Sequence, residues 1–572
     1  MDVTFLISNS TVLVLSGLFL ITTAAVYVYL YFFYVDIPKI DGIPEIPGGE
    51  ILAGHLYTLG NDHATTAEAW AFKYGWPVFQ LRMGRRRAIM LNSFEAARDW
   101  MVKNQAATLD RPWFHTFHGV ISATSAATIG TSPWDERTKK QRRVVGSFTT
   151  GPSIQKLRKV LHMETCAVIS SLYYDSQKGR TDIMPHIYQE RLALNLMMMF
   201  CYGTRFSSVE DPLLVQILKD ASTIASFRST SSNAQDFIPH LRYIGGNERT
   251  ATAKEVRGRR DQWLAKMLDN VRDSLNLHAG PKKSVAEMLL ADSSKDDLTA
   301  SRCHQSINSL VIKILIFKVD VKTILGGLMS GGFETIYSTA IITIGMLSTL
   351  QGQSMQQEAY EDIMKVYDTP ADAFNLCLTE EKSPYVMGLV KEALRFFPPL
   401  KLLPARQTFT EFVYQGATIP KGVLVYMNTQ AINRGMFLLA DQNLDKETYG
   451  PDAEQFRPNR WLGKDHGIPP PYHFAFGAGG RMCTAVNFSN RVLYALFLRL
   501  IISFKMTESK LSPPNTDYIN YKRDSTESTS IASEFKVNFT PRDTAVLEQC
   551  LEQAQDELTD LLPGVAAEPL IR

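Results

Sequence analysis

The longest apolar run of the chain lies near its beginning. No charged residue occurs between Asp2 and Asp36, and residues 12–35 are almost wholly apolar. Because a helix rises ~1.5 Å per residue, about 20 residues cross a bilayer core, and this run is long enough. A cleaved signal peptide is the alternative, but it has a shorter apolar run, basic residues before it and a small-residue cleavage site after it. We therefore predict a transmembrane anchor over 12–35 behind a short lumenal segment, 1–11.

The residues after this run are rich in proline and then in basic side chains. Each proline fixes φ and discourages helix before it, so residues 36–50 predict a stiff hinge. Only Asp2 precedes the run, whereas Lys39, Lys73 and residues 85–87 bring positive charge after it. Positive charge marks the cytoplasmic side of a membrane span, which places the body of the chain in the cytosol.

Beyond the hinge, strand-like patterns flank a long helical region. Residues 77–82 and 87–91 alternate near a period of two, as half-buried strands do. Short strands and glycine–proline turns return towards the C-terminal end. Between them the spacing favours helices, and the clearest candidates are 192–202, 211–225 and 251–274. The pattern predicts a mainly α fold with small peripheral β-sheets.

No repeat and no long low-complexity linker divides the chain. We therefore expect a single large domain over 51–543, followed by a C-terminal tail over 544–572. The net charge of +2 and the lack of a basic block with interleaved aromatic residues argue against nucleic acid as a partner. The six cysteines are far apart and form no CxxC pair, so neither a zinc site nor a disulfide framework is indicated.

Near the C-terminal end, one cysteine follows a glycine-rich bend. Phe476 stands seven residues before Cys483, with Gly477, Gly479 and Arg481 between them. The glycines permit a tight backbone beside a flat cofactor, the arginine can bind a carboxylate, and the phenylalanine can shield the sulfur. This arrangement suits a thiolate ligand to haem iron, which favours O–O cleavage. An ordinary glycine turn beside a buried structural cysteine is the alternative.

A second unusual segment lies on a long apolar helix. Gly331 and Gly332 precede Glu334 and Thr335 there. The small pair leaves room for a cofactor against the backbone, and a carboxyl beside a hydroxyl can relay protons to a reacting group. Alternatively, the helix is kinked, the glutamate is solvated and the threonine hydrogen-bonds its own turn.

Three charged residues predict a structural brace. Glu392 and Arg395 lie one helical turn apart and can pair along the helix. Arg460 lies in a proline-bounded loop shortly before Cys483. A buried triad of Glu392, Arg395 and Arg460 would tie the helix to that loop.

Together these segments resemble the cytochrome P-450 superfamily of haem-thiolate monooxygenases, over nearly the whole chain to about residue 543. The resemblance implies a mostly helical fold with haem b between the helix of residues 331–335 and the cysteine loop. It implies that Cys483 is the axial iron ligand and that Glu334 and Thr335 deliver protons on the opposite side. It further implies O2 as co-substrate, electrons from NADPH through a membrane-bound flavoprotein reductase, and a single-pass protein of the endoplasmic reticulum membrane with a cytosolic catalytic domain.

The resemblance also implies contacts to the haem propionates, from Arg406 and Arg481. The family usually has an arginine four positions after a tryptophan, but Thr138 stands at that spacing from Trp134, so Lys139 or Arg137 is expected to substitute. The basic cluster nearby is a candidate docking face for an acidic reductase, or else a plain solvated helix face. It comprises Arg137, Lys139, Lys140, Arg142 and Arg143.

Several stretches resemble the fungal phenylacetate hydroxylases within this superfamily, and these are 36–40, 111–118, 129–136 and 326–335. That resemblance implies a small aromatic or benzyl-bearing substrate. Aromatic side chains in the loop over the distal face would orient a phenyl ring by stacking, and the candidates are Trp113, Phe114, Phe117 and His118.

Three features depart from the family pattern. Ala485 stands where glycine is usual. Residues 311–320 and 435–444 look like insertions, and an exposed strand-like apolar run is an aggregation liability, so we hypothesise that either segment is translated intron sequence. Transcript sequencing that reads continuously through both segments would refute this hypothesis.

The preferred function is monooxygenation of an aromatic or benzylic carbon in a phenylalanine-derived or other aromatic small molecule, in the tailoring of a fungal secondary metabolite. Catabolic aryl-acetate hydroxylation is the alternative, and a cationic side chain that binds a substrate carboxylate would favour it. A haem-thiolate isomerase or dehydratase that does not use O2 can dispense with the Glu334–Thr335 pair. A haem-binding scaffold without enzymatic activity needs neither that pair nor an electron donor.

Overall fold

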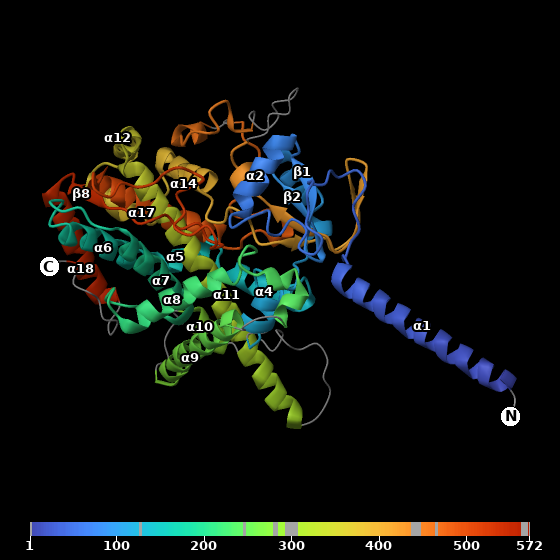
Figure 1. The fold of residues 1–572 in the computed structure, drawn as a ribbon. Helices are drawn as coiled ribbons and strands as arrows, with labels where there is room; N and C mark the ends of the chain where they lie inside the picture. The colour runs from blue at the N-terminus through green and yellow to red at the C-terminus, as the bar shows by residue number, and fades with distance from the viewer. Residues whose placement is uncertain are drawn as a thin grey trace.

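Helices dominate the chain, and three small sheets lie around them (Figure 1). The computed structural model describes residues 3–124, 128–243, 248–277, 284–291, 307–435, 448–463, 467–561 and 570. The mainly α fold with small sheets that the sequence predicts is confirmed.

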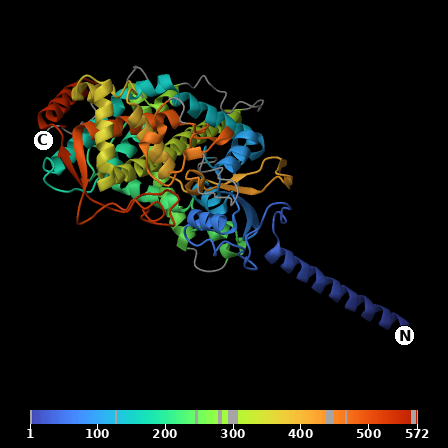
Figure 2. The ribbon, with the colours of Figure 1, turned by 90° about the horizontal axis from the view of Figure 1, so that it is seen from above.

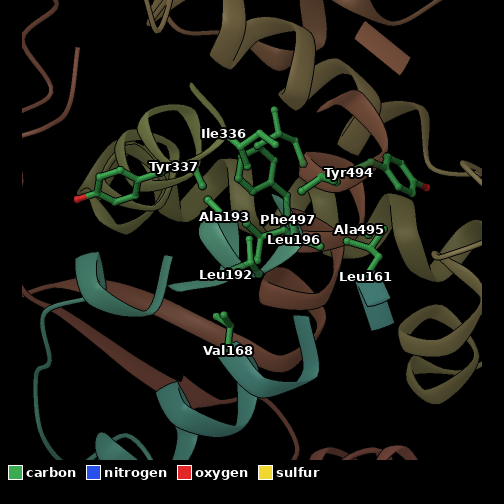
Figure 3. Close-up of a cluster of buried hydrophobic side chains, with 14 of the residues drawn as sticks. Leu161, Val168, Leu192, Ala193, Leu196, Ile336, Tyr337, Tyr494, Ala495 and Phe497 are labelled. Atoms are coloured by element: carbon green, nitrogen blue, oxygen red, sulfur yellow. The ribbon is translucent and has the colours of Figure 1, made fainter. Parts of the chain in front are cut away.

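The core is built around α11 (Ile307–Ser348), the longest helix. It packs against α7 (His186–Tyr202) and α17 (Val486–Ser503), and α6 (Arg158–Asp175) completes the group. In Figure 3, side chains from these four helices converge, among them Leu192, Ile336 and Phe497. A helix that is apolar on all faces is stable only when it is surrounded, and this explains the central place of α11.

The remaining helices cover this core. Asp211 caps α8 through its side chain, which accepts hydrogen bonds from the N–H groups of Leu213 and Leu214, and Pro212 begins the helix with a preset φ. The helices are α2 (His63–Tyr74), α3 (Phe94–Arg98), α4 (Glu136–Phe148), α5 (Gly151–Lys156), α8 (Pro212–Ser226), α9 (Glu248–Leu277), α10 (Val285–Ala291), α12 (Leu350–Val366), α13 (Pro370–Leu376), α14 (Pro384–Phe396), α15 (Thr429–Ile432) and α18 (Thr544–Leu561). The three helical candidates of the sequence correspond to α7, α8 and α9.

The largest sheet joins segments that are far apart in the sequence. Strand β2 (Arg86–Leu91) pairs antiparallel with β1 (Val78–Met83) and parallel with β6 (Leu424–Met427), and β6 pairs with β3 (Arg406–Gln407). The two strands predicted from alternation are β1 and β2. Two hairpin-like sheets complete the set, β4 (Phe412–Tyr414) with β5 (Ala417–Ile419) and β7 (Phe504–Glu508) with β8 (Val537–Pro541).

The N-terminal helix α1 (Val3–Phe33) projects away from the rest of the chain in both ribbon views (Figures 1 and 2). The apolar side chains of residues 14–29 are exposed, and Phe19 and Leu20 each show more than two thirds of their surface. Among the described residues, no single helix is long and apolar enough to span a membrane by itself, and the apolar stretch of α1 covers Val14–Tyr29. The part of α11 from Val321 onward is long and apolar enough to span a membrane only when it is taken together with α12. The two helices are bent by 102° relative to one another.

The proline-rich segment after α1 is fastened to the first sheet. Asp36 forms an ion pair of 2.6 Å with Arg86 and accepts the backbone N–H of Arg87. The buried Gln80 side chain bonds the backbone of both Ile40 and Ile43. These contacts fix the point at which α1 leaves the body.

The two segments suspected of being insertions differ in what the structure describes. Residues 311–320 lie within α11, so their backbone is helical and continuous with the helix that follows, rather than strand-like. The apolar spacing of such a short run does not separate a strand from a helix. Residues 436–444 lie outside the described residues. The intron hypothesis stays a prediction for transcript sequencing.

Candidate active site

A single large cavity lies between α11 and the loop that carries Cys483. Its volume is about 460 Å³. Residues 326–335 of α11 line one side, and residues 475–477 and 483–485 line the other. The two segments that the sequence predicts on opposite sides of a cofactor therefore face the same space.

The sulfur of Cys483 is exposed to this cavity. The Cys483 N–H donates to the carbonyl oxygen of Phe476 at 2.9 Å and closes the bend, while the Ala485 N–H points at the sulfur at 3.4 Å. Enclosure raises the pKa of the Cys483 thiol, whereas the Ala485 N–H and the Arg142 guanidinium lower it. The last two groups favour the thiolate, which is the form that binds iron.

The glycine at position 479 is required by the shape of the bend. Its φ is +63°, and a Cβ there would overlap the carbonyl oxygen of Met101. Gly477, with φ of +68°, lines the cavity, and a Cβ there would make only ordinary contacts of 3.8 Å with the side chains of Leu403 and Arg406. One glycine therefore lets two backbone segments touch, and the other leaves the cavity wall flat.

Four arginines gather at one end of the cavity, and they are Arg111, Arg142, Arg406 and Arg481. Burial and the neighbouring guanidinium groups lower the pKa of Arg481 to about 8 and that of Arg406 to about 9. Burial, Arg406 and Arg142 also hold the pKa of Arg111 well below its usual range. Like charges this close to one another repel, so the cluster is suited to bind an anionic group.

The hydrogen bonds of these arginines leave donors to spare. Arg481 donates to the carbonyl oxygen of Ser132 at 2.9 Å, and Arg111 donates to that of Ala405 at 2.8 Å. The Nε–H groups of Arg481 and Arg111 are buried and have no acceptor among the described residues. A bound dianion would satisfy both the unused donors and the excess charge.

Arg142 is the basic residue of α4 that lines the cavity. Trp134 lies beneath the Arg481 guanidinium, with 5.3 Å between the guanidinium carbon and the ring centroid. Lys139, predicted to reach the cofactor, instead pairs with Glu136 on the exposed side of α4. Arg142 comes one turn later, lines the cavity and donates to the Met482 carbonyl oxygen at 2.7 Å. A side chain three residues further along a helix lies on a neighbouring part of its surface, which the local spacing did not reveal.

The distal helix presents a small, smooth surface to the cavity. Gly331 is exposed there, and a Cβ built on it would meet nothing within 4 Å. Gly332 also lines the cavity, but a Cβ there would overlap the sulfur of Met197 on α7. Thr335 lines the cavity, and its hydroxyl donates to the Gly331 carbonyl oxygen at 2.9 Å. This bond within its own helical turn is the one that the sequence analysis named as the alternative to a proton-delivery role.

Glu334 is buried and is held by a distant loop. Its Oε2 accepts a hydrogen bond of 2.9 Å from the Thr529 hydroxyl. Burial raises the pKa of Glu334, and Arg228 and Thr529 oppose the rise. A carboxyl whose pKa is raised holds its proton to higher pH than a solvated carboxyl does, which suits a group that delivers protons. Thr529 and Arg228 carry no local sequence signal for this role.

The predicted brace is present in full. Arg395 forms two bonds to Glu392, of 2.7 and 2.9 Å, and Arg460 adds one of 3.0 Å. The indole N–H of Trp461 donates to Glu392 at 2.9 Å, and Arg395 also donates to the Asn433 carbonyl oxygen at 2.8 Å. Glu392 and Arg395 are fully buried. Their charges are therefore satisfied internally, and the strong cation partners lower the pKa of Glu392 despite its burial.

Three of the four predicted aromatic pocket residues line the cavity. These are Phe114, Phe117 and His118, which come before and within the single helical stretch His115–Ile121. Trp113 does not line it and is 52% exposed, with its ring stacked on the outer side of His118. Alternate side chains of an extended entry to a helix point to opposite sides, which accounts for the exposed position of Trp113.

The residues present fit a haem. The cavity joins a sulfur on one wall to a flat helical surface on the other. At its edge, unneutralised guanidinium groups match two carboxylates. These features together define a haem-thiolate site in a mainly α fold.

Comparison with known proteins agrees with this class. Residues 44–524 match the model of the Cytochrome P450 family. The chain is 36% identical to phenylacetate 2-hydroxylase of Emericella nidulans, across 94% of this chain and 98% of that protein. It is 30% identical to 3-hydroxyphenylacetate 6-hydroxylase of the same organism, across 88% of this chain and 90% of that protein. The chain belongs to the cytochrome P-450 family and is a monooxygenase, and the family implies haem with cysteine ligation, O2 and electrons from a reductase.

Proposed function

We propose that this monooxygenase hydroxylates a ring or benzylic carbon of a small aromatic substrate. The observation that carries the proposal is the cavity itself, in which Phe114 and Phe117 face the same space as Cys483 and Thr335. Aromatic walls favour a phenyl group through apolar burial and edge or face contacts. The two relatives of Emericella nidulans, named for hydroxylation of phenylacetates, support the same substrate type.

The chain's own residues divide the work of the site. Cys483 would bind the iron, and the guanidinium groups of Arg111, Arg142, Arg406 and Arg481 would bind the propionates. When bound, the haem supplies oxygen activation through a thiolate-ligated iron. Thr335 can turn its hydroxyl from the Gly331 carbonyl towards the cavity and hold a proton there. Glu334 can restore that proton, because its carboxyl lies next in the chain and is bonded to Thr529.

We propose the endoplasmic reticulum membrane as the location and a membrane-bound, NADPH-dependent flavoprotein as the electron donor. The exposed apolar surface of α1 supports the first proposal. The basic face of α4, close to the Cys483 loop through the Arg142–Met482 bond, supports the second. Opposite charge on a docking partner accelerates association and orients it.

The function is tested with the full-length protein, a fungal NADPH-dependent reductase and a panel of small aromatic compounds. The expected result is a hydroxylated product that carries one atom from labelled O2 and requires NADPH. Cys483→Ser is expected to lose both the product and the thiolate-type carbon monoxide spectrum. Cys377→Ser is the matched control, since Cys377 is buried and does not line the cavity. This variant should retain both the product and the carbon monoxide spectrum.

Product formation without incorporation of labelled oxygen would favour an isomerase or dehydratase. An intact carbon monoxide spectrum with no product from any aromatic compound would contradict the proposal. Gene deletion followed by metabolite profiling separates the two biological settings. Accumulation of an aryl-acetate indicates catabolism, and loss of a phenylalanine-derived product indicates tailoring.

A further inference from the structure

One cationic side chain that lines the cavity does not belong to the cluster of four arginines at its end. Arg228 follows α8 and lines the cavity opposite the Cys483 loop, beside α11. Its Nη2 donates to the Ser330 hydroxyl at 2.7 Å, and its guanidinium carbon lies 5.7 Å from the centroid of the Phe117 ring. A cation and an aromatic ring are thus presented side by side on the distal wall.

The hydrogen-bonding capacity of Arg228 is largely unused. A guanidinium has five N–H donors, and the bond to Ser330 is the one that Arg228 makes within the described residues. Its Nε–H is buried and meets no acceptor there. Glu334 is near enough for the charge of Arg228 to lower the pKa of that carboxyl, but no ion pair forms among the described residues, and the hydrogen bond to Glu334 comes from Thr529.

The other cations of the distal cavity are either paired or far from the reacting end. Lys401 donates to the Ile519 carbonyl oxygen at 2.7 Å, Lys522 donates to the Ser525 carbonyl oxygen at 3.2 Å, and Arg260 pairs with Asp261 at 2.8 Å. Lys322 lines the cavity on α11, but at thirteen residues before Thr335 it lies ~20 Å along the helix axis. Ser330, which holds Arg228, is only five residues and thus ~7.5 Å from Thr335.

We propose that Arg228 binds a carboxylate on the substrate, so that the substrate class is an aromatic ring with a carboxylate on a short side chain. The inference rests on the proposed aromatic hydroxylation. The carboxylate would take the unused guanidinium donors, and the ring would lie against Phe117 and extend towards Thr335. An arginine is suited to this because its planar fork matches a carboxylate and also stacks on an aromatic face.

The test compares two probes of the same shape, phenylacetate and its neutral analogue phenylacetamide, with the holoenzyme near neutral pH. The dissociation constant is read from the substrate-induced shift of the haem Soret band. We expect the wild-type protein to bind the acid more tightly than the amide. Arg228→Gln should weaken phenylacetate binding about tenfold to one-hundredfold, the usual cost of losing hydrogen bonds to a charged group, and leave phenylacetamide binding unchanged.

Two further variants keep the test decisive. Arg228→Lys keeps the charge but not the fork, and should recover only part of the preference for the acid. Lys322→Gln removes another cavity cation and should change neither constant. Should Arg228→Gln fail to give a thiolate-type carbon monoxide spectrum, the Lys variant and the acid-to-amide ratio of the wild type decide the question.

Three results would overturn the proposal. These are equal weakening of acid and amide in Arg228→Gln, no change in either, or a wild-type protein that binds the amide as tightly as the acid. The first would show that Arg228 only supports the loop after α8. Measurements of turnover distinguish this proposal from the proposed function on which it rests. If the enzyme hydroxylates neutral aromatic compounds but does not bind phenylacetate, the carboxylate role of Arg228 is overturned and the proposed aromatic hydroxylation stands.

Discussion

The hydroxyl of Thr529 donates a hydrogen bond of 2.9 Å to Oε2 of Glu334, across 195 residues of sequence. The contact joins the central helix α11 to the loop between β7 and β8. A neighbouring bond, from the Ser338 hydroxyl to the Ser530 carbonyl oxygen at 2.6 Å, joins the same two segments without touching Glu334. The proton-delivery carboxyl is therefore held by a segment that no local motif links to it.

The first prediction concerns this contact. Glu334→Gln removes a proton donor and should lower the rate of product formation by roughly one-hundredfold, within the range for general acid–base groups. Thr529→Val should have a smaller effect, about threefold to tenfold, because it removes one hydrogen bond from a carboxyl that stays in place. The measurements are the rate of product formation and the product formed per NADPH consumed, with hydrogen peroxide as the by-product.

Ser338→Ala is the control for the first prediction. It breaks the adjacent contact between α11 and the loop but leaves Glu334 and Thr529 paired. Equal loss of coupling in Ser338→Ala and Thr529→Val would show that the loop's position matters and its hydrogen bond to Glu334 does not.

The second prediction concerns Glu190, a partly buried carboxyl on α7 that accepts a hydrogen bond from Tyr337. Burial raises the pKa of Glu190 to about 7 from 4.5, and Arg523 opposes the rise. A raised pKa means that the folded state holds the proton more tightly than the unfolded chain. The contribution to stability is therefore fully present below about pH 4.5 and is lost as the pH rises through about 7.

Glu190→Gln keeps the shape but removes this titration. The variant should match the wild type near pH 5 and exceed its free energy of unfolding by about 1–3 kcal/mol near pH 8. Thermal unfolding across this pH range measures the difference. A constant difference between the two proteins at all pH values would contradict the prediction.

The third prediction separates two adjacent glycines of α11. Gly332→Ala places a methyl group on the sulfur of Met197 and should cost about 1–3 kcal/mol of stability, as overpacking does. Gly331→Ala meets no atom and should be neutral or stabilising by up to about 1 kcal/mol, since alanine favours helix. Its methyl group enters the cavity instead, so haem content and substrate affinity should fall.

Thermal unfolding and haem content measured on both variants test this division. The prediction is contradicted if Gly331→Ala is less stable than Gly332→Ala, or if Gly331→Ala retains full haem content and substrate affinity.

The fourth prediction concerns the brace. Glu392→Ala leaves the buried Arg395 without its carboxylate and should cost about 3–5 kcal/mol, the range for breaking a buried ion pair. Because the brace ties α14 to the segment that leads into the cysteine loop, the yield of protein with a thiolate-type carbon monoxide spectrum should fall with it. Thermal unfolding and that spectrum are the measurements.

An exposed ion pair serves as the reference for the brace. Lys382 and Glu380 lie 2.6 Å apart with about half of each side chain in solvent, and Lys382→Ala should cost no more than about 1 kcal/mol. A loss in Glu392→Ala no larger than this reference would contradict a structural role for the brace.

Much of the site was predictable because its parts are local. The glycine-rich bend, the Glu334–Thr335 pair and the one-turn spacing of Glu392 and Arg395 are short patterns whose chemistry follows from neighbouring residues. The helices α7, α8 and α9 and the strands β1 and β2 followed from periodicity in the same way. The sequence did not reveal that Lys139 and Trp113 lie outside the cavity lining, because the choice between two sides of one element depends on what packs against it.

The sequence by itself determined the class of the protein, since a thiolate loop, a proton-relay pair and a brace occur in one order along a mainly helical chain. Only the tertiary structure decided which side chains surround the reacting space. Arg111, Arg142, Arg406 and Arg481 form one cluster, and Thr529 and Arg228 face Glu334, across separations of up to several hundred residues. Such contacts arise from the packing of whole helices around α11. Because that packing is set by the fit of many apolar side chains, no short stretch of sequence encodes it.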